Sequence, residues 1–231
     1  MLLKIYTKNW NKLLFNTLKN KAIALFFVYH LVFSLLHFYE IKEIKTVYFD
    51  VQTTLLAWGI VIWLLIDCSN FFNVNSISYY IVNISNRSSF ILYYLIIILL
   101  LSVISVLVFG ILYFLIFTLF FKSEVYFSIL LNSLFKMIIG TYNFVLVAFL
   151  FILLMRSSLK GFIVFYIYQV IEKLIAKFFL KTLNYDFYYL PLIYLDKYVE
   201  QGSHFLEHLS MISIAFIFSI LVYKIFEKTN F

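Results

Sequence analysis

The residues with the most chemical potential in this chain are charges that lie inside apolar segments. Glu172, Lys173 and Lys177 fall within the stretch "GFIVFYIYQVIEKLIAKFFL". A charge at membrane depth is energetically expensive and is often retained for a function. Glu172 is therefore a candidate buried polar or pathway residue, and Lys136 on another apolar segment is a candidate partner. In the alternative, the helix begins at Leu159, and Glu172 and the lysines emerge at the outer interface, where long side chains snorkel.

Histidines form two further candidate sites. His30 and His37 are seven residues apart, which places them on one face of a helix. They could line a polar pathway or hydrogen-bond a neighbouring helix. His204 and His208 are four residues apart, a spacing that metal ligands can have, but no third ligand accompanies them. We therefore predict no metal site, and no hydrolytic motif indicates a catalytic residue.

Composition determines the kind of element that must position these residues. Apolar residues make up 65% of the chain and charged residues only 13%, unlike a soluble domain. We expect an all-α integral membrane protein, because backbone groups in lipid must find hydrogen bonds within their own helix. A transmembrane helix needs about 20 mostly apolar residues. The sequence predicts one transmembrane domain over 1–231, with six spans at about 22–38, 51–66, 90–121, 125–155, 161–180 and 205–223.

Lysine and arginine set the orientation of these spans. With both termini in the cytoplasm, ten of these residues lie in cytoplasmic segments and five in outer segments. The cytoplasmic segments include 1–21 and 67–89, and the longest outer segment is the loop 181–204. Segment 1–21 carries apolar residues at helical spacing and lysines on another face, which predicts an amphipathic helix in the inner interface of the lipid bilayer. The net charge of +7 follows from this topology, so no nucleic-acid partner is invoked.

The cytoplasmic segment 67–89 is longer than a simple connection requires. It is polar, yet it carries aromatic side chains and one arginine, which are the residue types that dominate interface hot spots. We predict a docking surface here. A short interfacial helix in the headgroups is the simpler alternative, with the arginine as a topology anchor. The candidate docking residues are Phe71, Phe72, Tyr79, Tyr80 and Arg87.

The layout resembles that of permease subunits of type-2 ABC transporters. The shared features are an amphipathic N-terminal helix, six spans with both ends inside, and a cytoplasmic segment that ends in Arg-Ser-Ser-Phe (87–90) before the third span. The third and fourth predicted spans form a long hairpin, closed by the short turn 122–124. A longer outer segment precedes the last span, as in that family.

The resemblance implies that transport and ATP hydrolysis belong to different subunits. The chain would span the bacterial inner membrane and form a substrate pathway with a second permease copy or a paralogue, lined by the second and fifth spans. ATP and Mg²⁺ would bind to separate ATPase subunits, and this chain has no Gly-x-x-x-x-Gly-Lys-Ser/Thr phosphate loop of its own. Segment 67–89 would be the coupling helix, and Arg87 is the best single candidate for a contact to the ATPase. Export is the transport direction that the family implies.

Two other functions fit the same sequence. One is a substrate-capture subunit of a vitamin uptake transporter, which also has six spans and no ATP site. The other is a membrane-embedded enzyme or assembly factor that uses Glu172, His30 and His37 as buried polar groups. The 29 Phe and 19 Tyr are expected mostly on lipid-facing and interfacial surfaces, and the scarcity of small residues favours packing by bulky aromatic side chains.

Overall fold

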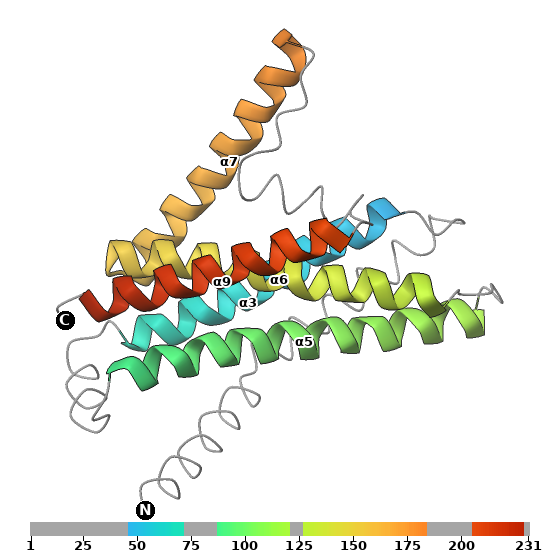
Figure 1. The fold of residues 1–231 in the computed structure, drawn as a ribbon, viewed down its shortest axis with the longest axis horizontal. Helices are drawn as coiled ribbons and strands as arrows, with labels where there is room; N and C mark the ends of the chain where they lie inside the picture. Colours follow the sequence, from blue (N-terminus) through green and yellow to red (C-terminus); the bar gives the residue numbers. More distant parts are fainter. Residues whose placement is uncertain (1–45, 72–86, 121–126, 184–204, 229–231) are drawn as a thin grey trace, which may run out of the picture. The chain divides into compact units, whose positions relative to one another are not determined.

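Five helices make up the part of the chain that the structure, a computed structural model, describes: residues 46–71, 87–120, 127–183 and 205–228. All of them belong to one compact unit, Lys45–Phe231. They are shown in Figure 1 with the labels used below. The helices are α3 (Thr46–Phe71), α5 (Arg87–Phe120), α6 (Phe127–Met155), α7 (Ser158–Leu183) and α9 (Phe205–Lys228).

Helix α6 is the centre of this unit. It packs against all four other helices, and α3 and α5 also contact each other. In the apolar window of α6, 72% of the residues are buried, whereas the corresponding share in α9 is 17%. α6 therefore supplies most of the core, and α9 is a peripheral helix that contacts α6 and α5.

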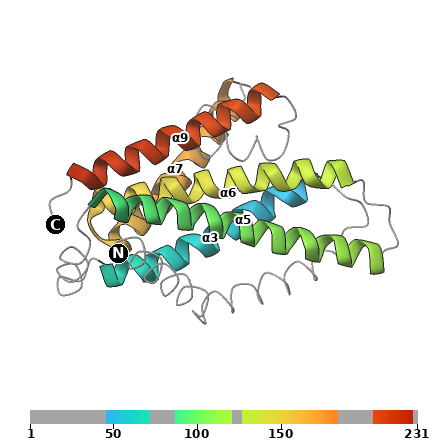
Figure 2. The same cartoon turned by 60° about the horizontal axis from the view of Figure 1, so that its bottom comes forward.

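The helices alternate in direction. The C-terminal ends of α3, α6 and α9 lie at the same end of the unit as the N-terminal ends of α5 and α7, and a second view agrees (Figures 1 and 2). Exposed Arg156, Lys160 and Lys224 belong to this end of the unit. This is the end that the distribution of positive charge predicts to be cytoplasmic.

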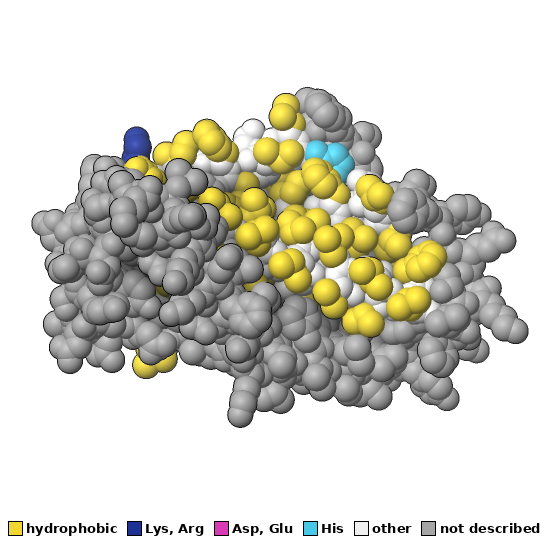
Figure 3. Space-filling model, turned by 90° about the horizontal axis from the view of Figure 1, so that it is seen from below, with side chains coloured by type: hydrophobic (Ala, Val, Ile, Leu, Met, Phe, Trp, Pro, Cys, Tyr) yellow, Lys and Arg dark blue, Asp and Glu magenta, His cyan; other side chains and the backbone are white. Residues whose placement is uncertain are grey.

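Three of the described helices are long and apolar enough to cross a membrane. Their apolar stretches are Tyr94–Leu115, Leu130–Met155 and Glu207–Phe226, and a shorter apolar stretch, Thr53–Leu65, lies in α3. The described surface is correspondingly hydrophobic, as the face in Figure 3 shows. Lipid can solvate such a surface and water cannot, so the chain is a membrane protein. The expectation of an all-helical membrane protein is confirmed for the described residues.

The observed helices extend beyond the predicted spans at several ends. α3 begins five residues before 51–66 and ends five residues after it, while α7 begins at Ser158, before the predicted start of the fifth span at 161. α5 and α6 have 34 and 29 residues, or roughly 51 and 44 Å of helix, against a hydrocarbon core of about 30 Å. Segments 1–21, 22–38 and 181–204, apart from the last turn of α7, lie outside the described residues.

A two-residue turn joins α6 to α7. Arg156 has a φ of 49°, the left-handed conformation that commonly ends a helix, and its N–H donates to the Leu153 carbonyl at 3.2 Å. Ser157 then caps α7, because its Oγ accepts from the Lys160 N–H at 3.5 Å and its carbonyl accepts from the Gly161 N–H at 2.9 Å. This turn makes α6 and α7 a tight helical hairpin.

Gly161 lets the two helices of this hairpin touch at their backbones. A Cβ atom placed on Gly161 would lie 2.4 Å from the Ile152 Cα, which no side-chain rearrangement can relieve. The first turns of α7 are therefore held directly on the last turns of α6. This close contact determines where the side chains further along α7 enter the core.

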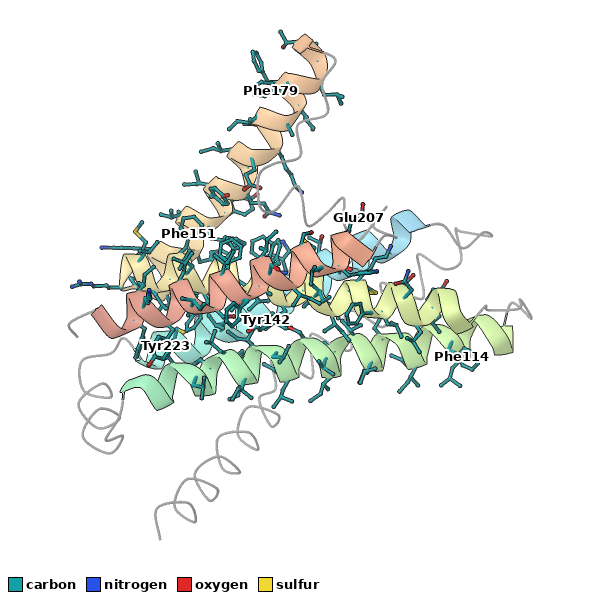
Figure 4. The ribbon with its side chains drawn as sticks, viewed as in Figure 1. Phe114, Tyr142, Phe151, Phe179, Glu207 and Tyr223 are labelled. Carbon is teal, nitrogen blue, oxygen red and sulfur yellow. The ribbon has the colours of Figure 1, made fainter. Side chains whose placement is uncertain are left out.

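Helix α7 leaves the core half-way along its length. Its buried residues, Gly161, Phe165, Gln169 and Glu172, recur every three or four positions and form one stripe. No residue of α7 beyond Glu172 is buried, among those whose side chains are described. This half of α7 diverges from the other helices, and Phe179 lies on it (Figures 1 and 4).

Candidate functional site

An aromatic cluster joins α3, α6 and α7. The Trp58 ring of α3 lies 5.5 Å from the Phe144 ring of α6 and 5.6 Å from the Phe165 ring of α7, measured between centroids. Phe144 and Phe165 meet edge to face at 5.2 Å. Phe165 is fully buried, with 0% of its surface exposed. Such edge-to-face contacts stabilise the packing beyond simple burial and fix the crossing of the three helices.

This cluster places some of the aromatic residues in the core. We predicted that most of them face lipid or the interface, but Trp58, Phe144 and Phe165 pack against one another between the helices. The other expectation, that bulky aromatic packing replaces small-residue contacts, describes this junction better. α6 and α7 are joined both by aromatic packing and by a small-residue contact, because Gly161 permits close approach of their backbones where the hairpin begins.

Glu172 lies next to the aromatic cluster. Phe151 of α6 contacts both Phe165 and Tyr168 of α7, with centroids 6.1 and 5.1 Å apart, and Figure 4 shows Phe151 at this junction. The Tyr168 hydroxyl donates a hydrogen bond to the Glu172 carboxylate one turn further along α7. Glu172 is only 1% exposed, and the neighbouring buried residue is Gln169, at 8%. The result is a polar group on one helix, in which a half-buried phenol accompanies a buried carboxylate and a buried amide.

The chemistry open to this group follows from its surroundings. A buried carboxylate beside aromatic rings can take up a proton or attract a cation, since both neutralise its charge where water is scarce. The phenol and amide of Tyr168 and Gln169 can orient the carboxylate or contact a polar ligand. We treat Tyr168, Gln169 and Glu172 as the candidate functional site of the described residues.

The structure gives Lys136 a carboxylate partner other than Glu172. Lys136 is 7% exposed, and the carboxylate that stabilises its charge is Glu207 at the start of α9. Beside this pair, the Phe135 ring contacts the His208 ring at 5.6 Å, edge to face. Glu172 itself is buried by the surrounding protein, whereas Lys173, Lys177 and Lys181 beyond it on α7 are exposed. The alternative of an interfacial Glu172 stays a prediction.

Further polar contacts tie α6 to α9. The Asn143 Nδ2 donates to the Met211 carbonyl at 3.3 Å, and the hydroxyls of Tyr142 and Ser219 share a hydrogen bond of 3.1 Å. Figure 4 places Tyr142 beneath α9. Thr141 Oγ1 and Asn143 Oδ1 are buried and have no hydrogen-bond partner within the described part of the chain. The middle of α6 therefore keeps unused hydrogen-bonding capacity.

The predicted docking residues are only partly within the described chain. Phe71 is the last residue of α3 and Arg87 is the first residue of α5, so the two helices frame the segment 72–86. Phe72, Tyr79 and Tyr80 lie outside the described residues. The docking surface therefore stays a prediction.

The other polar residues considered also lie partly inside and partly outside the described chain. His30, His37 and His204 lie outside the described residues. Cys68 is buried near the end of α3. Within the described helices, no three residues of the types His, Cys, Asp and Glu gather as a metal site requires.

The predictions from the sequence did not include Gln169 and Tyr168 as companions of Glu172. A signal was present, because Gly161, Phe165, Gln169 and Glu172 have the three- and four-residue spacing of one helical face. The apolar residues around them obscured it, since α7 is apolar on all sides in its first half.

Comparison with known protein families and with curated proteins finds no match for this chain.

Proposed function

We propose that this chain is the membrane-spanning subunit of an ATP-driven exporter of the type-2 ABC class. It would have six spans with both termini in the cytoplasm and an amphipathic N-terminal helix. It would act in the bacterial inner membrane as a dimer with a second copy or a similar permease. ATP and Mg²⁺ would be bound by separate ATPase subunits, so the chain itself would not be an enzyme.

The observation that carries this proposal is that the helices on either side of segment 72–86 in the sequence, α3 and α5, both belong to the packed core. α3 ends at Phe71 and α5 begins at Arg87, and these two helices contact each other and α6. A force applied to the segment would therefore reach both helices directly. The aromatic and arginine residues around it have the composition of a docking surface.

The long hairpin of α5 and α6 gives further support. Both helices exceed the length needed to cross the hydrocarbon core, and α6 is central to the packing. A movement of α5 is transmitted to α6 because bulky side chains interlock between them, such as Tyr94 and Phe149, whose rings stack at 5.7 Å. This arrangement suits a subunit that rocks as a unit between two states.

The test is site-directed photo-crosslinking in native membranes. A photoreactive amino acid is placed at Tyr79 or Arg87, and the captured chain is identified by mass spectrometry. We expect capture of a nucleotide-binding ATPase from both positions. Capture from Arg87 should be lost when segment 71–81 is replaced by a glycine–serine linker of equal length. The same photoreactive amino acid at Thr182, an exposed residue at the other end of α7, is the matched control and should capture no ATPase.

Capture of lipid alone, or of an unrelated scaffold protein, from Tyr79 and Arg87 would contradict the proposal. A scaffold protein would favour the substrate-capture subunit of an uptake transporter. Capture of the ATPase from Thr182 and from Tyr79 alike would show that the contact is not specific to the cytoplasmic segment.

A membrane-embedded enzyme or assembly factor is the second candidate. The burial of Glu172 against Tyr168 favours it, because a polar group deep among helices is often functional. It predicts activity in purified protein without any ATPase, and loss of that activity in Glu172→Gln. The transporter proposal predicts instead that function depends on ATP hydrolysis by a partner.

A further inference from the structure

The exposed half of α7 carries three lysines along one side. Lys173, Lys177 and Lys181 are spaced four residues apart, and all three side chains are exposed. Residues four apart lie on the same face of a helix, and the first and third of these are separated by roughly 12 Å along the axis. We call these three residues the lysine row.

An apolar row runs beside the lysine row. Ile171, Leu174, Ile175 and Phe178 follow the spacing of one helical face and are 46%, 61%, 37% and 62% exposed. No other described helix covers this row. The exposed half of α7 is therefore an amphipathic helix whose apolar side and cationic side are both unoccupied in the described part of the chain.

The lysine row has no acidic counterpart on its own helix. Between Lys173 and Leu183 the sequence contains no aspartate or glutamate. The adjacent Glu172 is buried, and successive residues of a helix point about 100° apart, so it does not neutralise the row. A group that balances this positive charge would therefore come from outside this helix.

We propose that this half of α7 binds an anionic phospholipid, with its phosphate on the lysine row and an acyl chain along the apolar row. The two rows match the two chemical parts of such a lipid, a negatively charged headgroup and a hydrocarbon chain. Lysine side chains reach headgroups by extending along the apolar surface, and a phosphate accepts hydrogen bonds from several ammonium groups.

Charge argues against a second copy of the chain as the occupant of these rows. In a two-fold symmetric contact, the same surface meets itself. Two lysine rows would then face each other with no acidic residue between Lys173 and Leu183 on either helix, and like charges across an interface oppose association. An anionic lipid neutralises the row instead. The proposal does not depend on the transporter function, since any membrane protein with this helix would bind the lipid.

The test is lipid binding to the purified full-length chain by native mass spectrometry. The detergent-solubilised protein is titrated with phosphatidylglycerol or with phosphatidylcholine. We expect preferential retention of phosphatidylglycerol by the wild type. The triple variant K173Q/K177Q/K181Q should bind it at least about tenfold more weakly, because each lysine near a membrane surface contributes to the attraction of anionic lipid. The triple arginine variant should retain binding.

The matched control is K160Q/K224Q, which removes two exposed lysines from the opposite end of the helices. It should bind phosphatidylglycerol as the wild type does. A further variant, L174Q/F178Q, leaves the lysines in place and should weaken binding through the acyl chain alone. Because all substituted positions are exposed, circular dichroism should show unchanged helix content in every variant.

Three outcomes would overturn the proposal. The first is equal binding of phosphatidylglycerol by wild type and K173Q/K177Q/K181Q, and the second is equal affinity of the wild type for both lipids. The third is displacement of phosphatidylglycerol by inorganic phosphate alone, which would make the row a site for free phosphate. A photoactivatable phosphatidylglycerol that labels α7 peptides in wild type and not in K173Q/K177Q/K181Q would support the proposed position directly.

Discussion

At the scale of single residues, the described core holds two acidic side chains in different environments. Glu172 is buried and has a phenol as hydrogen-bond donor, whereas Glu207 is half-buried and balances Lys136. A carboxylate beside an ammonium group is neutralised within the fold. Glu172 is the more deeply buried of the two carboxylates and also has a phenol as a hydrogen-bond donor, which makes it the better candidate for a functional role.

The pair Lys136 and Glu207 predicts unequal effects of removing either partner. Glu207→Gln should lower the free energy of unfolding by about 2 kcal/mol, because it leaves a buried ammonium group without its counter-charge. Lys136→Met should cost about 1 kcal/mol or less, because the remaining carboxylate is half-buried and can reach water. Both changes in the free energy of unfolding can be measured by thermal or denaturant unfolding of the protein in mild detergent.

The control for this prediction is Lys173→Gln, which alters an exposed lysine and should change stability by no more than about 0.5 kcal/mol. The double variant K136M/E207Q should be less destabilised than the sum of the single variants, by about 1 kcal/mol. Additive effects of the two substitutions would show that the pair does not interact.

At the scale of elements, the hairpin of α6 and α7 decides which residues of α7 reach the core. Arg156 in the left-handed conformation turns the chain, Ser157 starts the next helix, and Gly161 brings the two backbones together. The hairpin thereby orients the stripe of Phe165, Gln169 and Glu172 inward. Beyond this stripe α7 has no helix to pack against among those described, and its two rows are left for lipid.

Gly161→Ala should therefore destabilise the protein more than an alanine at another tightly packed glycine. The new Cβ would lie 2.4 Å from the Ile152 Cα, so the helix backbones must move apart, at a cost of about 3 kcal/mol. Gly110→Ala is the matched control, because its Cβ would meet the flexible Leu134 side chain at 2.7 Å.

For Gly110→Ala, the gain in helix propensity of up to about 1 kcal/mol offsets part of the crowding, and we expect a net effect within about 1 kcal/mol. Both variants are compared by their unfolding free energies in the same detergent. Equal tolerance of alanine at the two positions would mean that α6 and α7 are not in backbone contact.

At the scale of the whole molecule, the described helices run in alternating directions, as spans two to six of the proposed topology would. The basic residues Arg156, Lys160 and Lys224 belong to one end of the unit. The lysine row lies on the half of α7 toward its other end. In the proposed orientation, the lipid that it binds belongs to the outer leaflet.

Cysteine accessibility tests this orientation. The chain has a single cysteine, Cys68, which is 2% exposed and should not react. We expect a membrane-impermeant maleimide to label Lys181→Cys in intact cells and to label Arg156→Cys only after permeabilisation. Arg156 is exposed in the turn before α7, and Lys181 is exposed near the opposite end of this helix.

Wild type, with Cys68 alone, is the control and should remain unlabelled under both conditions. Labelling of Arg156→Cys in intact cells, with protection of Lys181→Cys, would invert the topology and remove the cytoplasmic docking surface from the proposed function.

Sequence alone determined that the chain is a helical membrane protein and where its described helices lie to within a few residues. Helix formation in lipid is local, because each backbone group bonds to a residue four positions away and each span must be apolar over a fixed length. The apolar runs around Phe90 to Met155 therefore predicted α5 and α6, and the small and charged residues of 156–160 predicted the turn before α7.

Only the tertiary structure decided which side chains meet. These contacts depend on how the helices rotate and cross, and therefore on packing between residues far apart in the sequence. Examples are the pair Lys136 and Glu207, the burial of Glu172 beside Tyr168, and the packing of Trp58 on Phe165. The same holds for the exposed half of α7. Its lysines and apolar residues are visible in the sequence, but their freedom from other described helices follows from the crossing at Gly161.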